Sequence, residues 1–407
     1  MTTSAQPAGG FRLSQLIYDT RYRSLTIQAV AFILLMAGLW ELVSNTIYNL
    51  AALGKDFNFS YLGNRAGFDI NQMLIPYDAD MTHGRAALVG ILNTLLVSAM
   101  GIVLATVIGV LAGVLRLSRN WLVARLMTVY VETFRNVPLL LWILLIYAIM
   151  SEAMPQPRDF RPDAEGVSEA SMWLWQSVAI TNRGVFVPAP VFHTGSFVVV
   201  VAFLLSIGGA LAWRSYARKA LFDSGRDLPM VWPALAILIL PSLILYFALG
   251  RPITLEYPAL SGFNFSGGIQ IRNPLIALWL ALSLYTGAFI AENVRAGILA
   301  VSKGQTEAAY ALGLSPRRTT SLVVLPQALR VIIPPLISQY LNLIKNSSLA
   351  IAVGYMDVKA TLGGISITQT GRELEGMLLM GLFYLVISLI VSTAMNAFNA
   401  RLRLKER

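Results

Sequence analysis

The chain is dominated by long stretches that are almost free of charged residues. Eight stand out: Ser24–Trp40, Ala86–Leu115, Asn136–Ser151, Gly184–Trp213, Leu228–Gly250, Asn273–Ala291, Val331–Ile344 and Gly376–Ala400. A membrane-spanning helix needs roughly 20 mostly apolar residues. The two short stretches, 136–151 and 331–344, follow polar sequence that is compatible with a helix, so we expect tilted or partly cytoplasmic helices there. The pattern predicts an all-α integral membrane protein with about eight transmembrane helices.

Composition excludes a soluble protein. Charged residues make up 13% of the 407 residues and hydrophobic residues 56%, whereas a soluble chain carries about 25% charged residues. The sequence has no cysteine, which excludes disulfides and thiol chemistry. Because it has only two histidines, His83 and His193, we expect no metal site and no cofactor on this chain.

Lysine and arginine indicate how the chain is oriented. Five segments hold 20 of the 31 basic residues: 1–25, 116–135, 214–229, 292–330 and 401–407. The predicted spans place all five on one side, and cytoplasmic loops carry such an excess. We therefore expect both termini in the cytoplasm and an even number of spans. The net charge of +10 then reflects topology, and no basic cluster in a soluble module indicates nucleic acid.

Two further points concern the first apolar stretch and the segments expected outside the membrane. The first apolar stretch continues past Glu41 to Ile47 without a small-x-small cleavage site, so it is expected to be a retained helix and not a signal peptide. The outer segments 48–85 and 151–183 contain many aromatic residues, including Trp173 and Trp175. These aromatics either anchor the chain at the membrane interface or dock an extracytoplasmic partner.

The loop between the sixth and seventh predicted spans has the most informative local pattern. Residues 305–312 are good helix formers, and Glu307 in the expected first turn would complement the helix dipole. Gly313 can end this helix in the left-handed conformation. Ser315 and Pro316 can begin a second helix. We predict a compact helix–turn–helix on the cytoplasmic face, which is either a docking surface or an ordinary capped loop.

The same loop resembles the EAA loop of importer-type ABC permeases. The matching residues are Glu307-Ala308-Ala309, then Gly313 after three further residues, then Leu325-Pro326, with Val323 where the pattern usually has Ile. The runs 130–140, 284–298, 325–335 and 343–349 are similar to the polar amino-acid uptake family. The resemblance covers roughly 88–150 and 272–400. The intervening insertion looks like that of the larger permease subunit of the general L-amino-acid importers.

The resemblance implies a five-helix ABC importer permease core with one N-terminal and two inserted helices added to it. The expected parts are 1–85, the N-terminal tail, extra helix and outer loop; 86–150, the first part of the core; 151–271, the insertion with its outer segment; 272–400, the second part of the core with the EAA loop; and 401–407, a basic cytoplasmic tail.

It also implies a permease subunit of a binding-protein-dependent amino-acid importer in a bacterial inner membrane. Coupling to the ATPase would fall on Gly304, Gln305, Glu307, Ala308, Ala309, Gly313, Leu325 and Pro326. The implied partners are ABC ATPase subunits that hold ATP and magnesium, a second homologous permease in a heterodimer, a periplasmic amino-acid-binding protein, and membrane lipid. The chain lacks the phosphate-binding loop of an ATPase, so we expect a transport subunit and no enzyme.

Polar residues within the predicted spans are candidates for function because they are costly in lipid. Glu132 with Arg135, and Glu292 with Arg295, are spaced to pair on a helix face near the cytoplasmic side. The substrate-path candidates are Glu292, Asn342, Lys345, Asn346 and Ser347. A structural role is favoured for Glu292, whereas Lys345 either snorkels to the interface or meets a substrate carboxylate.

Two other functions are compatible with such a chain. A secondary transporter of small polar solutes, driven by an ion gradient, predicts inverted repeats with broken helices at the midplane, and we find no paired repeat in the sequence. An integral-membrane enzyme needs a catalytic constellation near one interface, for which two histidines and no cysteine leave little material. The ABC importer is therefore the favoured hypothesis, with the secondary transporter as its alternative.

Overall fold

The computed structural model describes residues 20–52, 54, 56–164 and 167–402. Within them, seven helices are long and apolar enough to cross a membrane, and the bent pair Trp121–Asn136 and Leu139–Ala153 makes an eighth if it counts as one span. The prediction of a mostly helical protein with about eight spans is therefore confirmed. The long helices are α2 (Thr20–Ala52), α3 (His83–Leu115), α4 (Trp121–Asn136), α5 (Leu139–Ala148), α7 (Ser196–Ser224), α8 (Val231–Ala248), α9 (Asn273–Leu299), α12 (Leu325–Asn346) and α15 (Glu373–Leu402).

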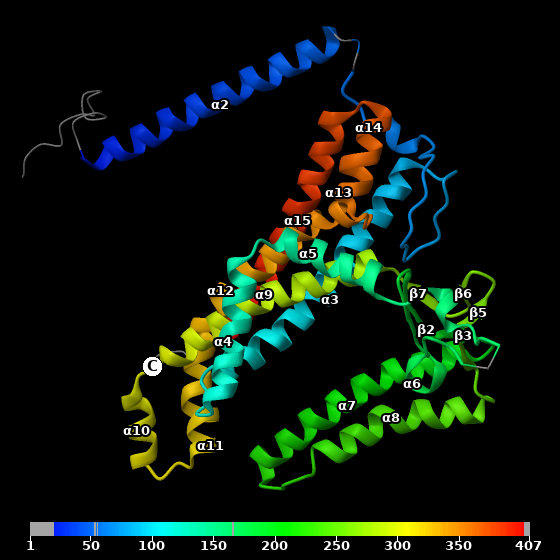
Figure 1. The fold of residues 1–407 in the computed structure, drawn as a ribbon. Coiled ribbons are helices and arrows are strands. Elements are labelled where there is room, and N and C mark those ends of the chain that lie inside the picture. The colour runs from blue at the N-terminus through cyan, green and yellow to red at the C-terminus, as the bar shows by residue number, and fades with distance from the viewer. Residues whose placement is uncertain (1–19, 53, 55, 165–166, 403–407) are drawn as a thin grey trace, which may run out of the picture.

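Short helical turns connect the long helices. On the side of the α3 amino terminus and in the insertion these are η1 (Ser60–Gly63), η2 (Ile149–Ala153), η3 (Pro157–Phe160), α6 (Trp173–Gln176), η5 (Ser347–Val353), α13 (Val358–Ala360), η6 (Thr361–Ser366) and α14 (Ile367–Thr370). At the opposite end lie α10 (Lys303–Ala311), α11 (Pro316–Thr319) and η4 (Thr320–Val324) (Figure 1).

The packed core is built around α3 and α9, which run side by side (Figure 1). Glycines on α3 allow this close approach. A Cβ added at Gly109 would lie 2.5 Å from the Cβ of Ile290, and one added at Gly113 would lie 2.6 Å from the carbonyl oxygen of Ala291. Side chains from α5, α12 and η5 complete the same buried apolar cluster. The core thus joins the segments 86–150 and 272–400.

The span at residues 121–153 is broken. Asn120 caps α4 by accepting a hydrogen bond from the Leu122 N–H at 3.0 Å. Val137 then leaves the helical region, with φ −104° and ψ 133°, because the residue before a proline is pushed towards extended backbone. After Pro138 the chain restarts as α5, and the two helices meet at 106°. The tilted helix expected over 136–151 is therefore the second half of a bent pair.

The insertion combines a helical hairpin, α7 and α8, with small antiparallel sheets (Figure 1). The strands are β1 (Ala179–Thr181), β2 (Gly184–Val187), β3 (Ala189–Phe192), β4 (Ile253–Glu256), β5 (Ala259–Ser261), β6 (Asn264–Ser266) and β7 (Ile269–Ile271). They pair as β1-β2-β7, β3-β4 and β5-β6. In the first sheet, Val185 lies opposite both Ile180 and Ile271.

The apolar stretch that begins at Gly184 is longer than one span, and its first part lies outside the helix. Residues 184–192 form two strands, and α7 begins at Ser196. Pro188 and Pro190 lack the N–H groups that a helix interior requires, and Gly195 has φ 94°, which ends the extended segment just before the helix. Apolar β-branched residues in this segment therefore pack in sheets instead of extending the span.

Helix α2 stands away from the other helices (Figure 1). None of its apolar window is buried by the rest of the chain, and Trp40, for example, is 74% exposed. A helix that is apolar on all sides needs an apolar environment. Its length and composition suit a bilayer.

Candidate functional site: a cytoplasmic loop, a charged cluster and an outer pocket

The predicted helix–turn–helix is present as α10 and α11, which project from one end of the molecule (Figure 1). Gly313 has φ +77°, and the Leu314 N–H donates to the carbonyl of Ala309 at 3.1 Å, so α10 ends in the left-handed turn expected at Gly313. The predicted position of Glu307 in the first turn of the helix is wrong. Ser302 has an extended backbone and precedes the helix, so α10 begins at Lys303, two residues earlier than predicted. Glu307 therefore lies beyond the first turn of α10.

Most of the predicted coupling residues form an exposed surface, which we call the coupling knob. Gly304, Gln305, Glu307, Ala308, Gly313 and Leu325 are exposed, Pro326 is half-buried and Ala309 is buried. The buried Ala309 fixes α10 against the rest of the loop. The Gln327 side-chain amide donates to the side-chain oxygen of Gln305 at 3.2 Å, which ties α10 to the first turns of α12. The knob is therefore attached to a helix that enters the membrane.

A charged cluster joins α3, α4 and α9. Glu292 accepts from Arg295 at 2.6 Å, as its spacing predicted, and also from Arg116 of α3. The predicted pairing of Glu132 with Arg135 is wrong. Glu132 lies 3.6 Å from Arg116, and Arg135 reaches Glu292 at 3.9 Å, because the three arginines converge on the carboxylate of Glu292. This candidate for the substrate path is thus engaged in holding three helices together.

The remaining path candidates fall on different sides of α12 and η5. Asn342 and Lys345 are exposed and, being three residues apart, share one face of α12. Asn346 is half-buried. Ser347 is buried, and its hydroxyl donates to the carbonyl of Ile344 at 2.7 Å. The structure therefore brings Asn342 and Lys345 together and separates them from Glu292 and Ser347.

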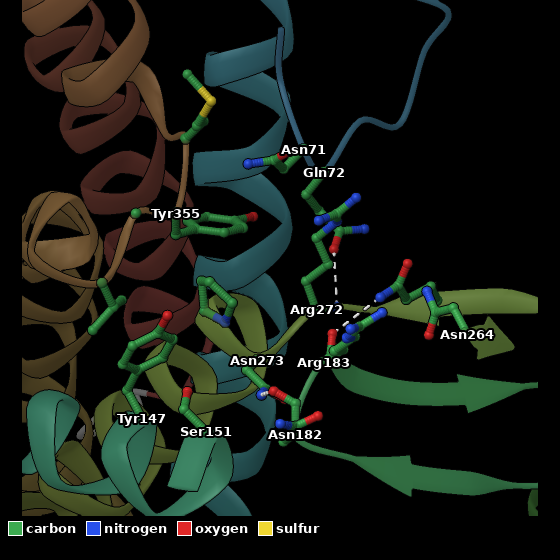
Figure 2. A pocket seen from close by; sticks show the side chains of 15 residues that line it. Asn71, Gln72, Tyr147, Ser151, Asn182, Arg183, Asn264, Arg272, Asn273 and Tyr355 are labelled. Atoms are coloured by element: carbon green, nitrogen blue, oxygen red, sulfur yellow. Dashed lines mark hydrogen bonds between the residues drawn. The ribbon is translucent and has the colours of Figure 1, made fainter. Parts of the chain in front are cut away.

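Sequence reasoning missed a polar pocket of about 550 Å³ (Figure 2). It lies beside the start of α9, whereas α10 follows the other end of that helix. Its walls come from the loop before α3, from α5 with η2, from the inserted strands, from the start of α9 and from the segment after η5. The polar lining side chains include Asn71, Gln72, Tyr147, Ser151, Asn182, Arg183, Asn264, Gln270, Arg272 and Asn273. A usable signal was two pairs of Asn and Arg neighbours, 182–183 within the insertion and 272–273 directly after it.

Hydrogen bonds between these segments fix the wall of the pocket. Asn273 donates to the carbonyl of Asn182 at 2.7 Å and to that of Met150 at 3.4 Å. The side-chain amide of Gln270 donates to the carbonyl of Arg183 at 3.0 Å. Core and insertion thus form one structure here. The described residues contain no group of three His, Cys, Asp or Glu side chains that could hold a metal ion.

Comparison with known proteins decides the family. Residues 205–404 match the family described as the inner membrane component of binding-protein-dependent transport systems. The glutamate/glutamine/aspartate/asparagine transport system permease protein BztB of Rhodobacter capsulatus is 57% identical, over 99% of each chain. The chain belongs to this permease family. The permease is also 45% identical to the general L-amino acid transport system permease protein AapQ of Rhizobium johnstonii, over 98% of its own length and 96% of that protein.

A third relative is the putative amino-acid ABC transporter permease protein YhdX of Escherichia coli, which is 43% identical over 95% of each chain. Such coverage means that the alignments run through the insertion 151–271 as well as the core. The permease is accordingly a multi-pass inner membrane protein and a transport subunit, not an enzyme. Membership of this family does not favour the secondary-transporter alternative.

Proposed function

We propose that this permease imports amino acids and is driven by a separate ABC ATPase that grips the coupling knob. The three relatives named above are all amino-acid permeases by name. The observation that carries the coupling proposal is the knob itself, which is exposed, ends at the left-handed Gly313 and is tied to α12 through Gln327 and Gln305. ATP and magnesium belong to the ATPase, where hydrolysis takes place.

Helix α12 connects the knob to the substrate path. It begins at Leu325, directly after the loop, and carries Asn342 and Lys345 on one exposed face near its other end. A displacement of the knob moves the start of α12, the helix that also carries this polar face. We assign the path to Asn342, Lys345 and the neighbouring Asn346. The ammonium group of Lys345 can meet a substrate carboxylate, whereas Glu292 and Ser347 serve the packing of the core.

The assembly that this mechanism requires has four kinds of component besides lipid. The permease pairs with a second, homologous permease, and two ATPase subunits seat against the cytoplasmic loops. A periplasmic amino-acid-binding protein delivers substrate to the outer face. Both termini lie in the cytoplasm, where the basic residues concentrate. Membrane lipid covers the apolar surface of α2, which the rest of the described chain leaves exposed.

Replacing Gly313 with alanine tests the coupling. Gly313 has φ +77° and Gly225, after α7, has φ +66°, and a Cβ at either position would meet no atom within 4 Å. Each alanine therefore introduces the same strain, on the order of 1 kcal/mol, and no clash. We expect Gly313→Ala to lower ATP-driven amino-acid uptake in proteoliposomes at least fivefold, with Gly225→Ala as the matched control that transports normally.

The same preparation tests the assembly. The tagged wild-type permease should co-purify with an ATPase and with a second permease, and uptake should require both ATP and the binding protein. Equal uptake by Gly313→Ala and Gly225→Ala would contradict coupling through the knob. Wild-type uptake that needs an ion gradient and no ATPase would contradict the importer itself.

A further inference from the structure

The outer pocket has the chemistry of an anion-binding site. Two arginines, Arg183 and Arg272, and several side-chain amides line it, and none of its lining residues is acidic. Arg272 is half-buried, and no hydrogen bond or ion pair to its guanidinium group is found within the described residues. The planar donors of this guanidinium group match a carboxylate in two parallel hydrogen bonds.

Arg183 lies across the pocket from the loop of Asn71 and Gln72 (Figure 2). One arm of its guanidinium donates to the carbonyl of Phe263 at 3.1 Å, which fixes the side chain and leaves its other donors available. Arg272 is held through its backbone, whose N–H donates to the side-chain oxygen of Gln72 at 3.4 Å. The fold thus positions both guanidinium groups, and each keeps N–H donors that are available to a ligand.

The wall of the pocket also contains buried acceptors. The side-chain oxygens of Asn182, Asn264 and Asn273 are buried and have no hydrogen-bond partner among the described residues. These oxygens are covered by the surrounding chain and do not reach a bound ligand. An α-amino acid offers a carboxylate for the arginines. The volume of about 550 Å³ lies in the range of small-molecule sites.

We propose that this pocket, shared by the core and the insertion, is an outer binding site that holds an amino acid by its α-carboxylate before it enters the span. Arg272 is the principal carboxylate ligand and Arg183 the second. The proposal rests on the proposed import function and adds to it a site that needs the inserted strands. Beyond the pocket, η5 leads from Val353 back to Asn346 and Lys345 of α12, so the site lies at the outer end of the proposed path.

Direct binding to the assembled complex tests the proposal. The permease with its partner subunits is placed in phosphatidylcholine nanodiscs without binding protein, and saturation with radiolabelled L-glutamate is measured. We expect L-glutamine to compete and glutaminamide, which has no carboxylate, to compete at least tenfold less well. Arg272→Gln should weaken glutamate binding at least tenfold, and Arg272→Lys should restore part of it. Equal competition by glutaminamide would overturn the proposal.

The matched control is Arg161→Gln. Arg161 lies in the same insertion, is exposed and does not line the pocket, so this change removes the same charge and should leave binding unchanged. Because no bond from the Arg272 guanidinium to the rest of the described chain is found, Arg272→Gln should assemble normally, which co-purification checks. Wild-type affinity in Arg272→Gln would refute the assignment.

Two outcomes separate this proposal from others. A lipid phosphate could occupy the same guanidinium groups, and nanodiscs with phosphatidylglycerol test this source. Loss of glutamate binding on adding that lipid would assign the pocket to lipid and overturn the amino-acid proposal. ATP-driven uptake by the wild-type complex is measured in parallel. Uptake without any binding in the nanodiscs would refute the pocket alone, whereas absence of ATP-driven uptake would refute the proposed function.

Discussion

Asp357 shows how a single buried carboxyl group responds to its surroundings. It is fully buried and lies between the candidate spans that end at Val353 and begin at Glu373. One side-chain oxygen accepts from the Ala360 N–H at 2.9 Å, and the other has no partner in the described chain. Burial raises the pKa of Asp357 from 3.8 to about 6, although the N–H groups of Ala360 and Lys359 and the charge of Lys359 act in the opposite direction.

The sign of this shift gives a prediction for Asp357→Asn. The folded pKa lies above the unfolded one, so the folded state binds the proton more tightly and wild-type stability falls as pH rises from about 4 to about 6. The shift corresponds to at most about 3 kcal/mol. Asparagine keeps the cap acceptor and cannot ionise. We expect the melting temperature of Asp357→Asn, relative to that of the wild type, to be higher at pH 7.5 than at pH 4.5. Thermal unfolding of the purified complex at both pH values measures this difference. A pH-independent difference would contradict this.

At the scale of the elements, the close contact between α3 and α9 depends on glycines of α3, because glycine has no side chain. In Gly113→Ala the new Cβ would lie 2.6 Å from the Ala291 carbonyl oxygen and 2.8 Å from the Cβ of Val294. Overpacking of this kind costs about 1–3 kcal/mol, more than the 0.5–1 kcal/mol that alanine gains over glycine in a helix. We expect Gly113→Ala to lower the melting temperature of the purified protein.

Gly208→Ala on α7 is the control for this prediction. No atom lies within 4 Å of a Cβ added there, so only the helix preference acts, and the melting temperature should stay the same or rise. If Gly113→Ala were as stable as Gly208→Ala, the two central helices would have to lie further apart than they do here.

Elements were predictable where local chemistry alone determines them. Apolar length identified the long helices, and Gly313 with Pro316 identified the turn of the coupling knob. The strands at 184–192 were missed because an apolar run has the same composition in a sheet and in a span. The outer pocket was missed for another reason. Its wall joins Asn71, Arg183, Arg272 and Met356, which only the tertiary fold brings together.

At the scale of the whole molecule, the bent pair α4 and α5 decides whether the number of crossings is even. The pair follows Arg116 at the end of α3, which contacts Glu292 near the last turns of α9. Near its end lies Met150, whose carbonyl oxygen accepts a hydrogen bond from the side-chain amide of Asn273 in the first turn of α9. The pair therefore begins beside one end of α9 and finishes beside the other. Counted as one crossing, it brings the candidate spans to eight, and we predict that both termini then lie on the same side.

Because the chain has no cysteine, single cysteines can test this topology without background from the permease. Ser224 at the end of α7, Ser261 in β5 and Ser302 before α10 are all exposed, and serine to cysteine changes little in size. A membrane-impermeant maleimide should label Ser261→Cys in intact spheroplasts, and should label Ser224→Cys and Ser302→Cys only after permeabilisation. Labelling of Ser224→Cys from outside would move the α7–α8 loop across the membrane and make eight crossings with cytoplasmic termini impossible.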